Sequence, residues 1–110
     1  MDTSADEGYK FTKENFNKAI VECKRKGLTP RILMLTNPNN PLGKTIASPQ
    51  IKEMIMLARE YNMHTIVDEI YACCVYRCTK TSETFISAAS IHDEVHGTMI
   101  AAKDVHIVWG

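Results

Sequence analysis

The 110-residue sequence has no excess of charge of either sign, because thirteen Lys and Arg residues balance thirteen Asp and Glu residues. This balance provides no basic surface for nucleic acid or for an anionic membrane. The sequence also lacks an apolar run long enough to span a bilayer. Its acidic first residues, MDTSADEG, resemble neither a secretory signal nor an Arg-rich transit peptide. We therefore expect a cytoplasmic protein without nucleic-acid or membrane partners.

The sequence also lacks the cysteine pattern of a disulfide-stabilised protein. Three of its four cysteines crowd into one short stretch, at Cys73, Cys74 and Cys78. We interpret them as reduced thiols, whose role stays open. No second ligand pair follows at zinc-finger spacing, and Asp93 stands after His92 where the His-Glu-x-x-His pattern of zinc helices needs Glu. No metal site is expected.

Hydrophobic residues make up 45% of the chain, which is typical of a globular protein. Helical periodicity predicts an amphipathic helix over residues 12–26, with Thr12 as its cap and Gly27 at its end. A second helix is predicted to open with Ser48 at the N-cap and Pro49 at the first helical position. Its expected buried stripe consists of Ile51, Met54, Ile55, Ala58 and Tyr61.

Short apolar runs predict β-strands over residues 31–36, 64–68 and 104–109. The first run does not alternate, which indicates a strand buried on both faces. A strand, a helix and a strand at this spacing predict a βαβ unit, so we expect an α/β fold with a mostly parallel sheet. Between the last two strands, residues 72–76 are expected to form a short extension, and residues 83–97 a helical turn or two.

Two polar segments follow the carboxyl ends of the first two strands. They read NPNNPLG, from Asn37 to Gly43, and DEIY, from Asp68 to Tyr71. Ligand sites of parallel sheets lie beyond these ends. A carboxylate there can hold a protonated ring nitrogen, whereas an amide and a phenol can donate to an aromatic oxygen. The set would suit a pyridinium ring that carries a hydroxyl group.

Each segment also has an ordinary explanation when it is taken alone. Asn, Pro and Gly are common in turns, Asp68 could cap a turn, and Tyr71 could be a half-buried packing residue. The joint order, spacing and strand context favour a functional site. We interpret Glu69 as a packing or helix-contact residue without a chemical role.

A nucleotide-binding α/β domain is a weaker alternative. Gly43-Lys44-Thr45 ends like a phosphate-binding loop, but Pro38 stands where that loop needs glycine. Lys44 is therefore interpreted as a solvated loop residue.

The two polar segments resemble the class I/II aminotransferase family, whose loop reads N-P-x-N-P-x-G and whose next strand ends D-E-x-Y. The resemblance is close over residues 30–72 and resumes at residues 104–110. The stretches NPNNPLGKTIASPQ and IVDEIYA are most like 1-aminocyclopropane-1-carboxylate (ACC) synthases and their animal homologues. The resemblance implies a fold-type-I enzyme that uses pyridoxal 5′-phosphate (PLP). Residues 1–110 would be a fragment of its large PLP-binding domain, a partial three-layer α/β/α unit.

The resemblance also implies residue roles. Asp68 would pair with the pyridine nitrogen of PLP, and Asn40 and Tyr71 would both donate to the 3-oxygen of the ring. Pro41 is a candidate for a cis peptide bond after Asn40. Gly43 would allow the tight turn away from the ring.

The implied function is that of a PLP-dependent enzyme acting on α-amino acids, either an ACC-synthase-like lyase or an aminotransferase, and homodimeric at full length. In the family, the lysine that bonds covalently to PLP follows the strand that resembles DVHIVWG. The sequence stops at Gly110, before that position, and Lys103 is a poor substitute, so no catalytic residue is assigned and this chain alone is expected to be inactive. The alternative is a catalytically inactive relic or scaffold of the same fold.

Overall fold

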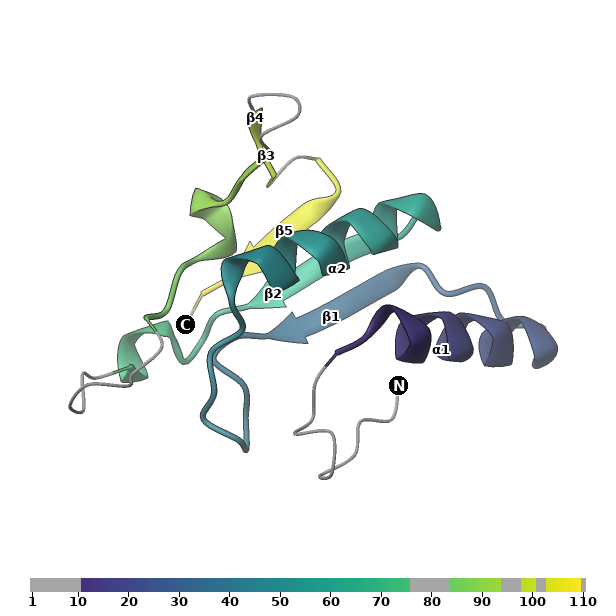
Figure 1. Ribbon diagram of the computed structural model, residues 1–110, viewed down its shortest axis with the longest axis horizontal. Helices are drawn as coiled ribbons and strands as arrows, with labels where there is room; N and C mark the ends of the chain where they lie inside the picture. Colours follow the sequence, from purple (N-terminus) through teal and green to yellow (C-terminus); the bar gives the residue numbers. More distant parts are fainter. Residues whose placement is uncertain (1–10, 76–83, 94–97, 101–102, 110) are drawn as a thin grey trace. The chain divides into compact units, whose positions relative to one another are not determined.

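The computed structural model describes residues 11–75, 84–93, 98–100 and 103–109. The chain divides into two compact units, residues 1–31 and residues 32–110, and each is described by itself. Figure 1 shows the helix of the first unit and the sheet and helix of the second. None of the described helices is long and apolar enough to cross a membrane.

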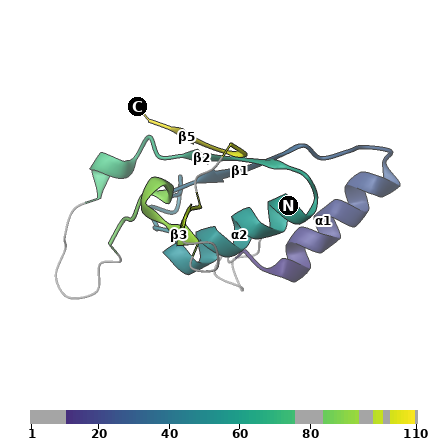
Figure 2. The same ribbon diagram turned by 90° about the horizontal axis from the view of Figure 1, so that it is seen from above.

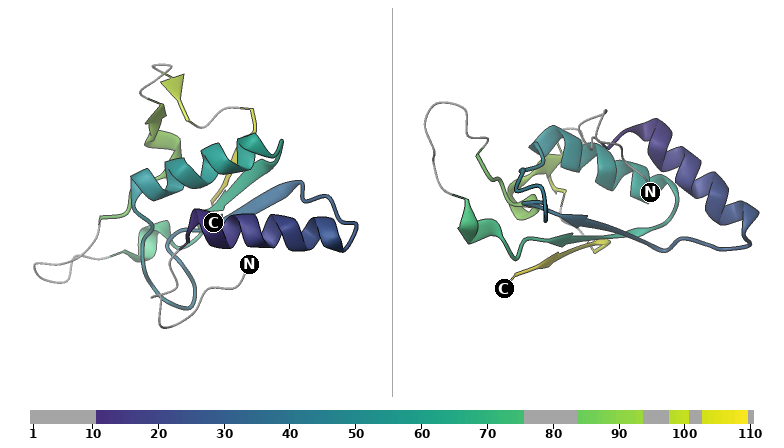
Figure 3. Two further views of the ribbon diagram at one scale, coloured as in Figure 1. Left: turned by 45° about the vertical axis from the view of Figure 1, so that its right-hand side comes forward. Right: turned by 90° about the horizontal axis from the view of Figure 1, so that it is seen from below.

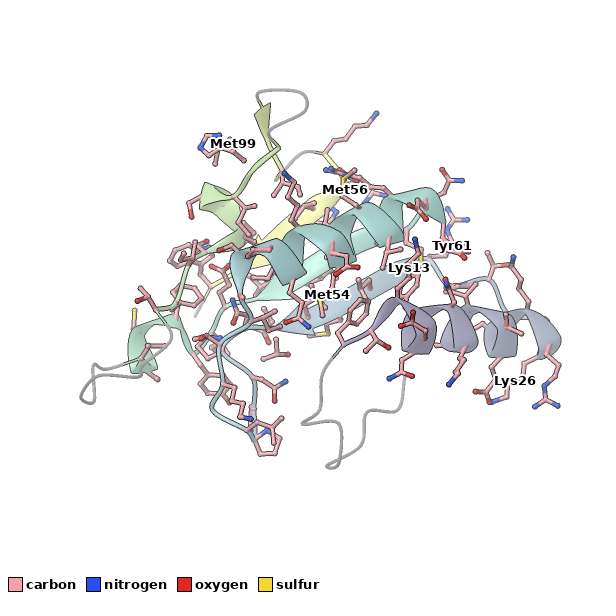
Figure 4. The ribbon with its side chains drawn as sticks, viewed as in Figure 1. Lys13, Lys26, Met54, Met56, Tyr61 and Met99 are labelled. Carbon is pink, nitrogen blue, oxygen red and sulfur yellow. The ribbon has the colours of Figure 1, made fainter. Side chains whose placement is uncertain are left out.

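The first unit contains helix α1 (Lys13–Arg25), which confirms the predicted helix. Thr12 caps it as expected, because its hydroxyl accepts a hydrogen bond from the backbone N–H of Asn15 at 3.1 Å. Gly27, at a φ of +70°, follows the helix in the left-handed conformation that favours glycine. On the exposed side, Lys26, which is labelled in Figure 4, lies 2.7 Å from the carboxylate of Glu22.

The second unit is built on a three-stranded sheet with strand order β1-β2-β5. Its strands are β1 (Ile32–Thr36), β2 (His64–Asp68) and β5 (Val105–Val108), and both neighbouring pairs are parallel. The predicted α/β fold with a parallel sheet is confirmed. Thr36 is paired with Asp68, so β1 and β2 end side by side.

Helix α2 (Ser48–Glu60) connects β1 to β2. Its buried residues include four of the predicted stripe, and Tyr61 is the C-cap. The predicted cap is wrong by one residue: Ala47 is the N-cap, and Ser48 begins the helix. The Ser48 hydroxyl is buried and has no hydrogen-bond partner among the described residues. With Pro49 in the first turn, one of the N–H groups that a side chain would cap is absent.

The core lies between α2 and one face of the sheet. Ile51 and Ile55 of α2 are fully buried against Val67 of β2 and Val105 of β5, and Ile91 and Ile100 belong to the same cluster. Each such side chain contributes roughly 1.5–3 kcal/mol when it leaves water. Figure 4 shows Met54 and Met56 on opposite sides of α2, and only Met54 is buried.

The other face of the sheet is open within residues 32–109 as far as they are described. Figures 2 and 3 show α2 on one side of β1, β2 and β5. On the opposite face, Ile32 is 56% exposed and Met34 is 61% exposed. The expected burial of the first strand on both faces is therefore not observed in these residues, because the described elements cover one face.

An ion pair joins α2 to the start of β5. The guanidinium of Arg59 donates to both carboxylate oxygens of Asp104, with Nη2 and Oδ1 2.9 Å apart. The same Nη2 donates to the carbonyl of Ile100 at 2.7 Å. The hydrogen bond from Arg59 holds the pKa of Asp104 below its usual value.

The connection between β2 and β5 differs in part from the sequence prediction. A 3-10 helical turn, η1 (Ala72–Cys74), replaces the predicted extension. A second such turn, η2 (Ala88–Ser90), confirms the expected helical turn. The short antiparallel pair of β3 (His92–Asp93) and β4 (Thr98–Met99) was not predicted, because strands this short leave no periodic pattern.

Candidate functional site

The polar loop after β1 is closed by its own hydrogen bonds. The side-chain oxygen of Asn37 accepts from the backbone N–H of Ile46 at 2.8 Å. Within the loop, Gly43 N–H donates to the Asn39 carbonyl and Asn39 N–H donates to the Lys44 carbonyl, both at 2.8 Å. Gly43 adopts a φ of +62°, so the expected tight turn is present. These bonds give the loop that carries Asn40 a defined shape.

Two peptide bonds in this loop are cis. The Asn40–Pro41 bond is cis, as predicted, and the Asn37–Pro38 bond is cis as well. Asn37 itself is fully buried, and its backbone N–H donates to the Asp68 carbonyl at 2.9 Å. The loop is therefore fixed directly to the end of β2.

The segment after β2 turns immediately. One carboxylate oxygen of Asp68, Oδ1, accepts from the backbone N–H of Ile70 at 3.1 Å. The N–H of Ala72 donates to the Glu69 carbonyl and that of Cys74 to the Tyr71 carbonyl, both at 2.9 Å. This chain of short-range bonds turns the backbone into η1 and places Tyr71 beside the strand end.

The two segments meet at a side-chain hydrogen bond. The Asn40 amide, through Nδ2, donates to the hydroxyl oxygen of Tyr71 at 3.0 Å, although 31 residues separate them in sequence. Both segments leave the sheet at the arrowhead ends of β1 and β2 (Figure 1). The structure thus brings Asn40 and Tyr71 into contact, and it places half-buried Asp68 at the same sheet edge.

The arrangement leaves donors and an acceptor for a ligand. The bond between Asn40 and Tyr71 uses one of the two Nδ2 hydrogens and does not use the phenolic hydrogen. The second Nδ2 hydrogen of Asn40 and the phenolic hydrogen of Tyr71 are therefore left to donate to a ligand. In Asp68, Oδ1 accepts the hydrogen bond from Ile70. The other carboxylate oxygen, Oδ2, can accept a hydrogen bond from a protonated ring nitrogen.

Glu69 is buried and contacts the helical turn η2, as expected of a packing or helix-contact residue, but the hydrogen bonds of its carboxylate were not predicted. This residue is 1% exposed, and its carboxylate accepts hydrogen bonds from the Ser87 hydroxyl at 2.7 Å and from the Ala88 backbone N–H at 2.8 Å. A signal was present, because Thr65 and Val67 point into the core and Glu69 continues their alternation. Among the described residues, no group of three or more His, Cys, Asp or Glu side chains is placed to hold a metal ion.

Comparison with known proteins identifies the family. The profile of the family described as "Aminotransferase class I and II" matches residues 1–108. ACC synthase 2 of Solanum lycopersicum is 33% identical over 92% of this chain, and the ACC synthase of Nicotiana tabacum is 32% identical over 92%. A human protein named "Probable inactive 1-aminocyclopropane-1-carboxylate synthase-like protein 2" is 29% identical over 93%.

The similarity extends along most of this chain and only a small part of each relative. The chain spans 20% of the two plant proteins and 16% of the human protein. The match to the family covers both polar segments and all three strands of the parallel sheet. The chain therefore belongs to the aminotransferase class I and II family of fold-type-I PLP-dependent enzymes, and it is similar to ACC synthases and ACC-synthase-like proteins.

Proposed function

We propose that this chain contributes the ring-binding part of a PLP site in a longer, homodimeric enzyme that acts on α-amino acids, as an ACC-synthase-like lyase or as an aminotransferase. The observation that carries the proposal is the contact between Asn40 and Tyr71 at the sheet edge where β2 ends in Asp68. An amide and a phenol meet at the sheet edge where a carboxylate also lies, and together they provide the donors and the acceptor that a 3-hydroxypyridinium ring requires.

Each residue has a defined task in this proposal. Asp68 holds a proton on the ring nitrogen through a charge-assisted hydrogen bond. Asn40 and Tyr71 both donate to the ring oxygen and fix the orientation of the ring in its plane. When bound, PLP supplies an electron sink for negative charge that develops at the α-carbon of the substrate.

The proposal can be tested on this chain with pyridoxamine 5′-phosphate, which lacks the aldehyde and cannot react with surface lysines. In an NMR titration, the ligand should shift the side-chain amide signals of Asn40 and the backbone signals of residues 68–71. We expect weak binding, with a Kd of roughly 1 mM. Asp68→Asn should weaken it about tenfold, and phenyl phosphate, which has neither a ring nitrogen nor a 3-oxygen, should leave these signals unchanged. Equal shifts with both ligands would argue against a ring site.

A second candidate is a catalytically inactive protein that retains the fold. The name of the human relative, which includes the words "probable inactive", favours it. The two candidates differ in turnover rather than in ring binding. A longer protein containing this chain should bind PLP and either form 1-aminocyclopropane-1-carboxylate or exchange amino groups if it is an enzyme. Binding without either reaction would favour the inactive candidate.

A further inference from the structure

Glu69 is a buried acid that stands directly between the ring-binding residues in sequence. It follows Asp68 at the end of β2, and Tyr71 comes two residues later. Its side chain points to the opposite face of the sheet from that of Asp68, because neighbouring residues of a strand alternate. Glu69 therefore does not face the proposed ring. Its position in the backbone nevertheless affects how Asp68 and Tyr71, on either side of it, are oriented.

The backbone of Glu69 is held on both sides. Its N–H donates to the carbonyl of Val108 at the end of β5, and its carbonyl accepts from the N–H of Ala72, each at 2.9 Å. The first bond ties the residue to the sheet, and the second begins the turn that carries Tyr71. Glu69 is thus the last residue of the sheet framework and the first residue of the turn.

The side chain of Glu69 ties this point to η2. Its Oε2 accepts from the Ser87 hydroxyl at 2.7 Å, and its Oε1 accepts from the N–H of Ala88 at 2.8 Å. Ala88 is fully buried in the core cluster. Ser87 is itself anchored, because its hydroxyl oxygen accepts from the N–H of Ala89 at 3.2 Å and its carbonyl accepts from the backbone N–H of Ser90 at 3.0 Å. The carboxylate therefore connects the start of the turn to a rigid part of the core.

The relative strengths of the hydrogen bonds indicate that the bonds of the Glu69 carboxylate position the contact between Asn40 and Tyr71, and not the reverse. The bond between Asn40 and Tyr71 is exposed and joins two neutral groups. A neutral bond in contact with water contributes less than bonds to a buried carboxylate, whose loss leaves polar groups unsatisfied. The bond between Asn40 and Tyr71 is too weak to fix the turn by itself, so the turn needs a stronger anchor.

We propose that Glu69 is a positioning residue: its bonds to Ser87 and Ala88 hold the turn so that Tyr71 lies against Asn40 and both point at the same ligand oxygen. This inference rests on the proposed function for its meaning. The contact that it concerns can nevertheless be measured without any cofactor.

The experiment follows the Asn40 side-chain amide by NMR in the 110-residue chain, with Tyr71→Phe as the reference for a lost contact. Glu69→Met should move the Asn40 signals to the position of this reference. Glu69→Gln should give intermediate positions, because the amide can still accept from Ala88 and can donate to the hydroxyl oxygen of Ser87. In Glu69→Met, hydrogen exchange at the Ala88 N–H should accelerate at least about tenfold.

Two serine variants decide the matter if Glu69→Met does not fold. Ser87→Ala removes one of the two donors and should move the Asn40 signals part of the way to the Tyr71→Phe position. Ser90→Ala is the matched control, because it removes a hydroxyl from the same turn that bonds to the Ser87 carbonyl and not to Glu69. It should leave Asn40 unchanged.

The inference is overturned if Asn40 keeps its wild-type signals in Ser87→Ala and Glu69→Gln while exchange at Ala88 accelerates. Glu69 would then support only the packing of η2. This outcome is separate from failure of the proposed function. If pyridoxamine 5′-phosphate leaves the strand end unaffected while Asn40 still responds to Glu69, the ring site is wrong and the positioning of Tyr71 stands.

Discussion

Arg59 and Asp104 form a two-point ion pair that joins the last turn of α2 to the residue before β5. Both carboxylate oxygens are engaged, and the side chains are 27% and 23% exposed. The contact lies at the end of the sheet opposite the proposed site, because β2 and β5 run in parallel from this end toward the site. It is therefore suited to tests of stability that leave the site residues untouched.

The pair predicts a specific dependence of stability on pH. The hydrogen bond from Arg59 lowers the pKa of Asp104 from 3.8, so the pair stabilises the folded state above that value and is lost as pH falls through the folded-state pKa. Asp104→Asn should lower the free energy of unfolding by about 1 kcal/mol at pH 7. The deficit should shrink in acid, below pH 3.8, where the wild-type carboxyl also becomes protonated. Urea unfolding of the wild-type chain and of Asp104→Asn, at pH 7 and below pH 3.8, measures this difference in free energy.

A second ion pair provides the control. Glu22 and Lys26 lie one helical turn apart on α1, and Lys26 lowers the pKa of Glu22, but both side chains are largely exposed. Water and salt screen such a pair, so Glu22→Gln should cause no measurable loss of stability. If Glu22→Gln lowered the free energy of unfolding as much as Asp104→Asn does, net charge rather than the contact with Arg59 would explain the loss of stability in acid.

The ring-oxygen donors predict a spectroscopic effect in a longer, PLP-loaded protein that contains this chain. Asn40→Ala and Tyr71→Phe should each shift the visible pH titration of the bound cofactor, because each removes one donor to its 3-oxygen. The loss of turnover should be smaller than for Asp68→Asn. A titration that is unchanged in both variants would contradict the assignment of these two residues.

The common location of the candidate site residues could be predicted from sequence, because its determinants are local and regular. Each polar segment directly follows a strand, and strand pairing in register brings Thr36 next to Asp68, which aligns the two segments. The turn at Gly43, whose positive φ favours glycine, is also encoded locally. Because the strands are regular, the order of the residues was enough to predict that the two polar segments lie at the same edge of the sheet.

The features that escaped prediction depend on tertiary contacts. The N-cap of α2 is Ala47 rather than Ser48, because a serine before a proline signals a cap, whereas packing decides which residue becomes helical. The role of Glu69 depends on Ser87 and Ala88, which return to it from 18 and 19 residues away. No local pattern contains such a pairing. The open sheet face was not predicted either, because an apolar run does not show which of its faces is covered.

The open face predicts association of this chain. Large apolar side chains lie on the described part of the sheet or at its end and are substantially exposed: Ile32, Met34, Val108 and Trp109. Exposed apolar faces and unpaired strand edges favour self-association. Met34→Lys should lower the apparent association constant about tenfold, as expected when one buried side chain is removed from an interface. Light scattering after gel filtration, over a range of concentrations, gives the masses.

Val21→Lys is the matched control for this experiment. Val21 is 65% exposed, much like Met34, but it lies on α1. Val21→Lys changes the net charge by the same amount as Met34→Lys, so any effect of charge alone appears in both variants. A wild-type chain that stays monomeric at every concentration would contradict the prediction.

The strongest prediction concerns Asp68 in a longer, PLP-loaded protein that contains this chain. Asp68→Asn should lower kcat roughly a thousandfold, which corresponds to about 4 kcal/mol in the barrier. The reason is electrostatic: an ionised partner within hydrogen-bond reach keeps the ring nitrogen protonated, and a neutral amide does not. The ring is then a poorer acceptor of negative charge from the α-carbon of the substrate.

The competing explanation for Asp68 is structural, since its Oδ1 caps the N–H of Ile70 at 3.1 Å. Asparagine keeps a side-chain oxygen that can accept this bond, so Asp68→Asn separates the two roles. Asp68→Ala removes the cap as well and should lower the melting temperature further, with a similar loss of kcat. Measuring kcat and the melting temperature on the same preparations decides between them. Near-normal kcat in Asp68→Asn, together with a lowered melting temperature, would make Asp68 a turn residue and remove it from the ring site.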